Sequence, residues 1–450
     1  MEKEKIGFVS LGCPKNLTDT EVMLRRLTEA GYTITPEETE ADVIIINTCG
    51  FIESAKTEAI DNILDIAWLK KNARLKKIIV CGCLVQRYGR EVAEQFPEVD
   101  GILSVGAFGD IVEAVKSVLD GKRYINLKKP EELALGGDRI VTTTQYAYLK
   151  IAEGCDNRCS YCAIPGIRGK FRSREIDDIV SEAKELENLG AGEIVLVAQD
   201  TTGYGLDIYG KYSLAELIRK ITENTLSVRL RVLYCYPDKI TDELCREFAV
   251  NDRLIKYVDM PIQHISDGIL KKMNRHGGSE VIKDAFARLR AACPGIIIRT
   301  TVIVGFPGET EEDFEELKQF VRQIKAERLG AFTYSAEEGT PASEMPDQIP
   351  EEVKQRRYDE IMTVQSEIAE KINSGRIGKR EIAVVEDYDP LSESYCCRSD
   401  AEAPEIDGKI YLTGVPKNSL APGDMVDVTI KEAIDSDLVA QLTDLKSKKK

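Results

Sequence analysis

The first quarter of the chain alternates between short apolar runs and segments with helical periodicity. Continuous apolar runs at 5–11, 43–47 and 77–81 predict strands that are buried on both faces. The expected helices run from a capping box of Thr18 and Glu21 to near Gly31, and over 52–73 and 85–96. This alternation predicts a doubly wound parallel sheet in a domain at 4–120.

The same alternation resumes after a polar segment at 121–140, which is expected to be a linker because it contains Pro130 and the pair Gly136-Gly137. Six further strands are expected at 146–152, 193–198, 229–233, 257–260, 296–304 and 329–334. Helical patterns lie between them, and a last helix is expected at 351–372. Consecutive strand–helix units of this kind predict a partial (β/α)6 barrel in a domain at 141–372.

Residues 374–440 have a different pattern, in which short strand-like runs are separated by turn residues such as Asp407-Gly408 and Pro422-Gly423. The runs lie at 382–385, 395–398, 409–412 and 424–430. Their spacing predicts a small all-β barrel. The predicted fold class is therefore α/β, with an N-terminal doubly wound parallel sheet, a central partial (β/α)6 barrel and a C-terminal β-barrel.

Composition narrows the function classes. The chain has 450 residues, of which 77 are acidic and 61 basic, for a formal net charge of −16. This charge argues against non-specific nucleic-acid binding, which needs clustered Lys and Arg. No stretch reaches the roughly 18 apolar residues of a membrane span, and the N-terminus runs directly into a strand without a signal peptide, so we expect a cytoplasmic protein without a membrane partner.

The 12 cysteines stand beside only 2 histidines. In a reducing compartment, many cysteines indicate metal binding or catalysis rather than disulfides. Cys155, Cys159 and Cys162 form the motif C-x3-C-x2-C after the first expected barrel strand. Three thiolates suit a soft metal centre, and zinc is disfavoured because no nearby histidine supplies the fourth ligand of a structural site. A 4Fe–4S cluster with three protein ligands would keep one iron open.

Three single cysteines, Cys13, Cys49 and Cys83, each follow the end of an expected parallel strand, and each has a glycine beside it. Ligands of open α/β sheets gather at that edge, so these thiols could converge on one cluster. They could equally be three ordinary buried cysteines, which are common in protein cores. The pattern of residues alone leaves both interpretations open.

Two further groups of residues carry weaker signals. His264 follows an expected barrel strand and is either an active-site residue or a core histidine with satisfied hydrogen bonds. The remaining cysteines are assigned no chemistry and are expected to have packing roles; they are Cys81, Cys235, Cys245, Cys293, Cys396 and Cys397.

The cysteine segments together resemble the methylthiotransferase family of radical S-adenosylmethionine (SAM) enzymes. They are Ser-Leu-Gly-Cys-Pro-Lys-Asn at 10–16, Asn-Thr-Cys-Gly-Phe at 47–51, Cys-Gly-Cys-Leu-Val-Gln at 81–86, and the motif at 155–162. The resemblance covers about 4–440. It implies the family's three parts in order: a methylthiotransferase domain, a radical SAM core and a TRAM domain.

The resemblance also implies the cofactors. One 4Fe–4S cluster would be held by Cys155, Cys159 and Cys162 and would bind SAM at its open iron, and an auxiliary 4Fe–4S cluster would be held by Cys13, Cys49 and Cys83. Two SAM molecules would be consumed per turnover, one as the methyl source and one as the source of a 5′-deoxyadenosyl radical. An electron donor and a sulfur donor are implied as partners. Gln199, Gly305 and Glu309 are expected to line the SAM pocket.

Within this family, the motifs are more similar to the branch that modifies an aspartate β-carbon in small-ribosomal-subunit protein twelve than to the branch that modifies tRNA adenosine. The segment Leu-Gly-Cys-Pro-Lys-Asn stands where tRNA enzymes usually have an aromatic-Gly-Cys-Gln-Met-Asn type. Residues 381–440 also carry 14 acids and 4 bases, net −10, which favours a basic protein partner over RNA unless the acidity only aids solubility. A tRNA adenosine methylthiotransferase and a non-catalytic iron–sulfur electron-transfer protein remain the alternatives.

Overall fold

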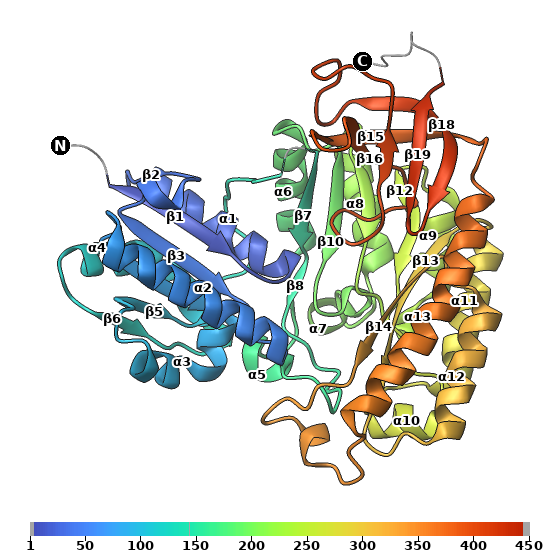
Figure 1. Ribbon diagram of the computed structural model, residues 1–450, viewed down its shortest axis with the longest axis horizontal. Helices are drawn as coiled ribbons and strands as arrows, with labels where there is room; N and C mark the ends of the chain where they lie inside the picture. The colour runs from blue at the N-terminus through green and yellow to red at the C-terminus, as the bar shows by residue number, and fades with distance from the viewer. Residues whose placement is uncertain (1–3, 144, 444–450) are drawn as a thin grey trace.

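The N-terminal part of the computed structural model, which describes residues 4–143 and 145–443, is a parallel sheet with the strand order β2-β1-β3-β4-β5-β6 (Figure 1). The strands are β1 (Lys5–Ser10), β2 (Thr33–Ile34), β3 (Val43–Thr48), β4 (Lys77–Gly82), β5 (Gly101–Leu103) and β6 (Tyr124–Asn126). The helices are α1 (Pro14–Glu29), α2 (Glu53–Asn72), α3 (Cys83–Gln95) and α4 (Ile111–Leu119). All six residues of β3 are buried, as expected for a central strand covered on both faces.

Each face of this sheet has its own core. Met23 of α1 and Val115 of α4 pack on one face, and Ile63 of α2 and Val92 of α3 pack on the other. Helices on both faces of a parallel sheet define the doubly wound arrangement, so the predicted fold of this part is confirmed.

Two details of the sequence analysis were wrong in this part. The first helix begins at Pro14, not at a capping box of Thr18 and Glu21, because the fixed φ of proline suits the first helical turn. The Thr18 hydroxyl lies inside the helix and donates a hydrogen bond to the Lys15 carbonyl. The expected linker at 121–140 contributes β6, which pairs with β5, so the sheet extends past residue 120.

The central part is an open parallel sheet with the order β14-β13-β12-β11-β10-β7. Its strands are β7 (Tyr146–Lys150), β10 (Glu193–Val197), β11 (Arg229–Val232), β12 (Leu254–Asp259), β13 (Ile297–Val304) and β14 (Arg328–Thr333). The long helices are α6 (Ile176–Asn188), α8 (Leu214–Asn224), α9 (Asp242–Val250), α11 (Gly278–Ala292), α12 (Glu311–Ile324) and α13 (Glu351–Ser374). Because β7 and β14 are edge strands, the barrel is partial, as predicted.

Short elements fill the connections of the central part. They are the two-stranded antiparallel sheet of β8 (Ala152–Glu153) and β9 (Arg172–Ser173), and the helices α5 (Ile164–Arg168), α7 (Leu206–Tyr209) and α10 (Asp267–Lys272). The loop between β8 and α5 carries the C-x3-C-x2-C motif.

The C-terminal part is a closed barrel with the order β15-β16-β17-β19-β18. Its strands are β15 (Arg380–Asp389), β16 (Ser394–Arg398), β17 (Ile410–Leu412), β18 (Met425–Ile434) and β19 (Asp437–Leu442). This confirms the predicted small β-barrel. The sequence analysis missed β19, which closes the barrel by pairing with both β17 and β18 and extends past the expected end at residue 440.

The segment between β16 and β17 closes the amino-terminal end of the central barrel. The Tyr257 hydroxyl donates to the Asp407 carboxylate at 2.7 Å, and Arg328 pairs with Glu402 at 2.8 Å. Ala403 packs among the barrel side chains Tyr148 and Tyr257. The C-terminal barrel therefore lies at the end of the barrel opposite to the cysteine motif, as Figure 1 shows.

The N-terminal part contacts both edges of the open barrel. At the β7 edge, Lys150 pairs with Asp19 of α1. At the β14 edge, Glu337 pairs with Arg87 of α3 at 3.2 Å and accepts a hydrogen bond from the Glu53 backbone N–H at 2.9 Å. Helices of the N-terminal part thus contact β7 and the segment that follows β14. None of the helices formed by residues 4–143 and 145–443 is both long and apolar enough to cross a membrane.

Candidate functional site

Cys13, Cys49 and Cys83 lie at the carboxyl ends of β1, β3 and β4, which are adjacent strands of the sheet. The loops that carry them are in contact. A Cβ atom on Gly12, whose φ is +91°, would lie 2.8 Å from the Cys49 Cβ, and one on Gly50 would lie 2.6 Å from the Leu84 Cα. Glycine is therefore required at both positions to let the three loops approach one another.

Two cations face this first triad of cysteines. The Arg168 guanidinium donates to the Cys83 Sγ at 3.3 Å. Burial raises the pKa of Cys83 to about 12 and also raises that of Cys49. Burial alone would raise the pKa of Cys13 too, but Lys15, Arg168 and backbone N–H groups bring it below its ordinary value. The nearby positive charge favours the thiolate, which is the form that binds metal.

The second triad, Cys155, Cys159 and Cys162, lies on the loop between β8 and α5. Cys155 and Cys159 are 7% and 5% exposed. The Cys155 N–H donates to the Gly169 carbonyl, and the Asn157 amide donates to the Cys155 Sγ at 3.4 Å. These bonds hold the loop at the carboxyl end of the barrel, where barrel enzymes place their chemistry.

A polar cluster supports this loop from the neighbouring strands. The Asn157 side-chain amide also donates to the Asp200 carboxylate at 2.7 Å. Lys239 donates to the Asn157 side-chain oxygen Oδ1 at 2.7 Å and pairs with Asp200. Asp200 follows β10 and Lys239 follows β11. The loop is therefore positioned by residues from two further barrel strands.

Both triads have the donor set of an iron–sulfur cluster. Throughout the described residues, no three His, Cys, Asp or Glu side chains are placed to hold a single metal ion. A four-iron cluster has a different requirement, since each thiolate binds its own iron and the sulfurs are spread further apart. Burial is the main cause of the raised pKa of Cys83 and of Cys162, and the other two thiols of each triad raise it further, which is consistent with the three thiols of each triad lying near one another. The residues present fit two clusters, each with one iron left open.

The segment after β11 connects the two triads. The Lys15 ammonium lies 3.5 Å from the ring centroid of Tyr234. Two residues later, the Tyr236 hydroxyl lies 3.8 Å from the Cys159 Sγ, and the Arg275 guanidinium stacks on the Tyr236 ring at 4.3 Å. The first triad therefore approaches this segment from the sheet, and the second approaches it from the barrel loop.

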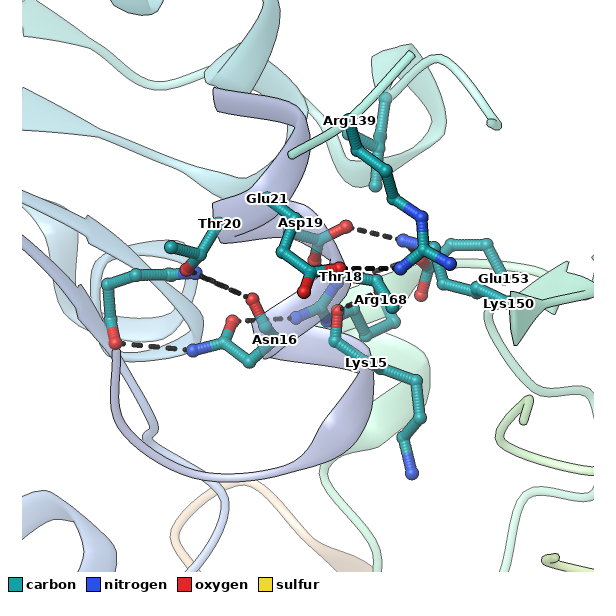
Figure 2. A network of polar contacts seen from close by, with 12 residues as sticks. Lys15, Asn16, Thr18, Asp19, Thr20, Glu21, Arg139, Lys150, Glu153 and Arg168 are labelled. Carbon is teal, nitrogen blue, oxygen red and sulfur yellow. Dashed lines mark hydrogen bonds and ion pairs between the residues drawn. The ribbon is translucent and has the colours of Figure 1, made fainter. Parts of the chain in front are cut away.

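A buried ion network joins α1 to the barrel beside the first triad (Figure 2). Arg168 donates to Asp19 at 2.6 Å and to the Asn16 side-chain oxygen at 3.1 Å. Lys150 pairs with Asp19 and, at 2.7 Å, with Glu153. Because Asp19 and Asn16 belong to α1 while the other residues belong to the barrel, this network fixes the sheet relative to the second triad.

The structure places the other predicted residues as follows. Gln199 is half-buried and directly precedes Asp200. A Cβ on Gly305 would lie 2.3 Å from the Lys354 side chain, and the Glu309 carboxylate lies 3.3 Å from Arg357, so Gly305 and Glu309 both contact α13. These three stay predictions for the SAM pocket.

His264 and the unassigned cysteines are buried. The His264 Nδ1 accepts a hydrogen bond from the Ser266 backbone N–H at 3.0 Å, and burial lowers the pKa of His264 to about 3, so the ring is neutral. Cys81, Cys235, Cys245, Cys293, Cys396 and Cys397 are all buried and unpaired.

No role was predicted for Lys15, Arg168 or Tyr234 from the sequence. Lys15 lies within a cysteine motif and Arg168 lies six residues after another, and this proximity was the signal that could have found them. Tyr234 had none, because only the fold brings the end of β11 to the first triad.

The chain is 48% identical over 444 residues to the ribosomal protein uS12 methylthiotransferase RimO of Desulforamulus reducens, covering 97% of this chain and 99% of that protein. It is 48% identical over 446 residues to the protein of the same name from Clostridium tetani, covering 99% of both. The chain belongs to the RimO family. The methylthiotransferase resemblance is thereby confirmed, and this RimO-family protein is a SAM-dependent transferase.

The domain matches agree with this family. Residues 5–104 match the uncharacterized protein family UPF0004, residues 149–321 the radical SAM superfamily, and residues 377–443 the TRAM domain. The fold is similar to that of the radical SAM methyltransferase TsrM from Kitasatospora setae, solved with cobalamin and a [4Fe–4S] cluster bound, at a TM-score of 0.58 and 15% identity, covering 76% of this chain and 77% of that one. The RimO family uses 4Fe–4S clusters and SAM.

Proposed function

We propose that this RimO-family protein attaches a methylthio group to the β-carbon of an aspartate in ribosomal protein uS12. The observation that carries the proposal is that the segment from Tyr234 to Tyr236 contacts Lys15, two residues from Cys13 of the first triad, and Cys159 of the second triad. A carbon that must lose a hydrogen at one centre and gain sulfur at the other has to lie within reach of both. A site with a single triad would not meet this requirement.

Cys155, Cys159 and Cys162 would hold one 4Fe–4S cluster together with SAM, and Cys13, Cys49 and Cys83 would hold the other. When bound, these groups supply radical hydrogen removal at one centre and a methylated sulfur at the other, chemistry that no side chain provides. An electron donor and a sulfur donor complete the proposed partners.

The chain's own residues would hold and shield these groups. Arg168 contributes positive charge beside the Cys83 sulfur at 3.3 Å. The half-buried rings of Tyr234 and Tyr236 would place aromatic surface beside the two triads, next to Lys15 and to Cys159. Excluding water from such a site protects a reactive intermediate from side reactions.

The choice of substrate is supported by the names of the relatives and by the charge of the C-terminal barrel. Five of the 14 acids at 381–440 pair with arginines in the folded chain: Glu381, Glu386, Asp400, Glu402 and Asp407. The others make no ion pair with a described residue. The five paired acids therefore stabilise the folded chain, and the other acids at 381–440 still favour a basic protein over an RNA backbone. We also propose a cytoplasmic location and folding units close to 4–120, 141–372 and 374–440.

The test is anaerobic reconstitution with iron and sulfide, then incubation with SAM, reductant and either uS12 or tRNA. Mass spectrometry of both substrates should show a methylthio group on one uS12 aspartate and unmodified tRNA. Modified adenosine with unmodified uS12 would assign the protein to the tRNA branch. Bound clusters without 5′-deoxyadenosine formation would indicate a non-catalytic electron carrier.

A further inference from the structure

Lys15 is a buried cation that has the Cys13 thiol nearby but no carboxylate partner among the described residues. The residue is 5% exposed, yet its ammonium makes no ion pair with any carboxylate among residues 4–143 and 145–443. Its described contact is the face of the Tyr234 ring, at 3.5 Å from the centroid. Figure 2 shows its side chain pointing away from the network of Asp19, Arg168 and Lys150, with the nitrogen at a free end.

Two neighbouring buried cations are paired with carboxylates. Lys150 pairs with Asp19 and Glu153, and Arg168 pairs with Asp19. Burying a charge is unfavourable unless it is paired and hydrogen-bonded. A cation–π contact offsets only part of this penalty. An ammonium at this depth with a thiol nearby but no carboxylate partner therefore indicates a place for an anion that a ligand supplies.

The position of Lys15 is fixed by a constrained aromatic residue. Tyr234 has a φ of +63°, a conformation that is uncommon for bulky residues. Its N–H donates to the Asp259 carboxylate at 3.0 Å, and its carbonyl accepts from the Thr201 N–H at 3.0 Å. Strained backbone that is held by its surroundings is typical of functional sites. The ring that supports the ammonium is thus held in place, next to the segment that both triads approach.

We propose that the Lys15 ammonium binds the side-chain carboxylate of the substrate aspartate. This inference rests on the proposed function. The β-carbon of aspartate is bonded directly to that carboxylate. An ion pair between the carboxylate and Lys15 would therefore position the reacting β-carbon near the segment that Lys15 and Cys159 both contact. The negative charge of the auxiliary cluster already has a cation, since Arg168 lies 3.3 Å from the Cys83 sulfur.

SAM also carries a carboxylate that could bind Lys15. The experiment therefore distinguishes the carboxylate of the substrate aspartate from that of SAM. The reconstituted holoenzyme, with SAM but without reductant, is titrated calorimetrically with uS12 and with a uS12 variant whose target aspartate is asparagine. Lys15→Met keeps the length of the side chain but removes its charge. Lys184→Met, on the exposed surface of α6, is the matched control.

Lys15→Met should weaken uS12 binding roughly 10- to 100-fold, the range expected for losing one hydrogen-bonded charge pair, and Lys15→Arg should restore part of it. Lys184→Met should bind like the wild type. The aspartate-to-asparagine change in uS12 should weaken binding to the wild type by a similar factor, with little further effect on Lys15→Met. Such non-additivity is the signature of a direct contact, and a merely structural role would not produce it.

Three results would overturn the assignment. Additive effects of the two changes would mean that Lys15 and the aspartate do not touch. A raised dissociation constant for SAM would place the SAM carboxylate on Lys15. Lower iron content or a changed cluster spectrum would assign Lys15 to the cluster. If the wild type leaves uS12 unmodified, the proposed function fails and this inference fails with it, whereas normal modification with additive effects overturns only the Lys15 contact.

Discussion

Replacing Arg168 with methionine tests whether the buried ion network joins the sheet to the barrel. The side chain is 1% exposed and donates to Asp19 at 2.6 Å and to the Asn16 side chain at 3.1 Å. The network holds two carboxylates, Asp19 and Glu153, and two cations, Lys150 and Arg168. Removing Arg168 leaves one buried negative charge uncompensated. Breaking a buried ion pair in this way costs about 3–5 kcal/mol.

The assay is urea unfolding of the apoprotein at neutral pH, followed by far-ultraviolet circular dichroism. Arg168→Met should lower the free energy of unfolding by about 3–5 kcal/mol. The matched control is Arg25→Met on α1, whose ion pair with Glu29 at 2.7 Å is exposed to solvent. Exposed pairs of this kind contribute about 0.5 kcal/mol or less.

A double variant tests whether uncompensated charge causes the loss of stability. Adding Asp19→Asn to Arg168→Met leaves only Lys150 and Glu153 charged, so the buried group is neutral again and part of the lost stability should return. If Arg168→Met is no less stable than Arg25→Met, the network does not stabilise the junction. If the double variant is less stable than Arg168→Met alone, uncompensated charge is not the cause of the loss.

Three further predictions concern the triads and the helix α13. Cys155→Ala should abolish SAM cleavage, whereas Cys83→Ala should still produce 5′-deoxyadenosine without methylthiolation; any product from Cys83→Ala would contradict its role as an auxiliary-cluster ligand. Gly12→Ala should lower the iron bound per chain, because its Cβ would lie 2.8 Å from the second cysteine, while Gly31→Ala, with a similar φ of +94° and open space around it, should keep its iron. Burial raises the pKa of Glu309 to about 7 from 4.5, so the folded state holds a proton that the unfolded state loses, and the free energy of unfolding falls as the pH rises from 4.5 to 7. Glu309→Gln should remove about 3 kcal/mol of this pH dependence, measured by urea unfolding at several pH values. An unchanged pH dependence in Glu309→Gln would contradict the prediction.

The regular elements were predictable because they rest on local patterns. The apolar run at 43–47 is a strand because its side chains must be buried on both faces, and it appears as β3. Elements with weaker local patterns were missed: β6 and β19 form because neighbouring strands offer them hydrogen-bonding edges. The capping box at Thr18 failed for a related reason, since the motif fitted locally while Pro14 started the helix one turn earlier.

In the candidate site too, the residues that share one local motif were predictable, whereas those brought together by the fold were not. The motif at 155–162 pointed to a cluster by spacing alone, because three thiols within one loop are close in any compact conformation. Cys13, Cys49 and Cys83 were ambiguous from spacing, and their placement at adjacent strand ends depends on the order β1-β3-β4. Gly305 illustrates the limit of sequence reasoning, since its missing side chain makes room for Lys354 of α13 in the folded chain.

By itself, the sequence determined the chemical type of this protein: all-thiolate centres on an α/β scaffold with an acidic β-barrel. Only the tertiary structure decided which groups meet. It brought Lys15 onto Tyr234, Arg168 onto Cys83, and the two triads onto one segment after β11. The physical reason is that ligand type is a property of individual side chains, whereas the distance between residues far apart in the chain depends on how the sheet and the barrel pack together.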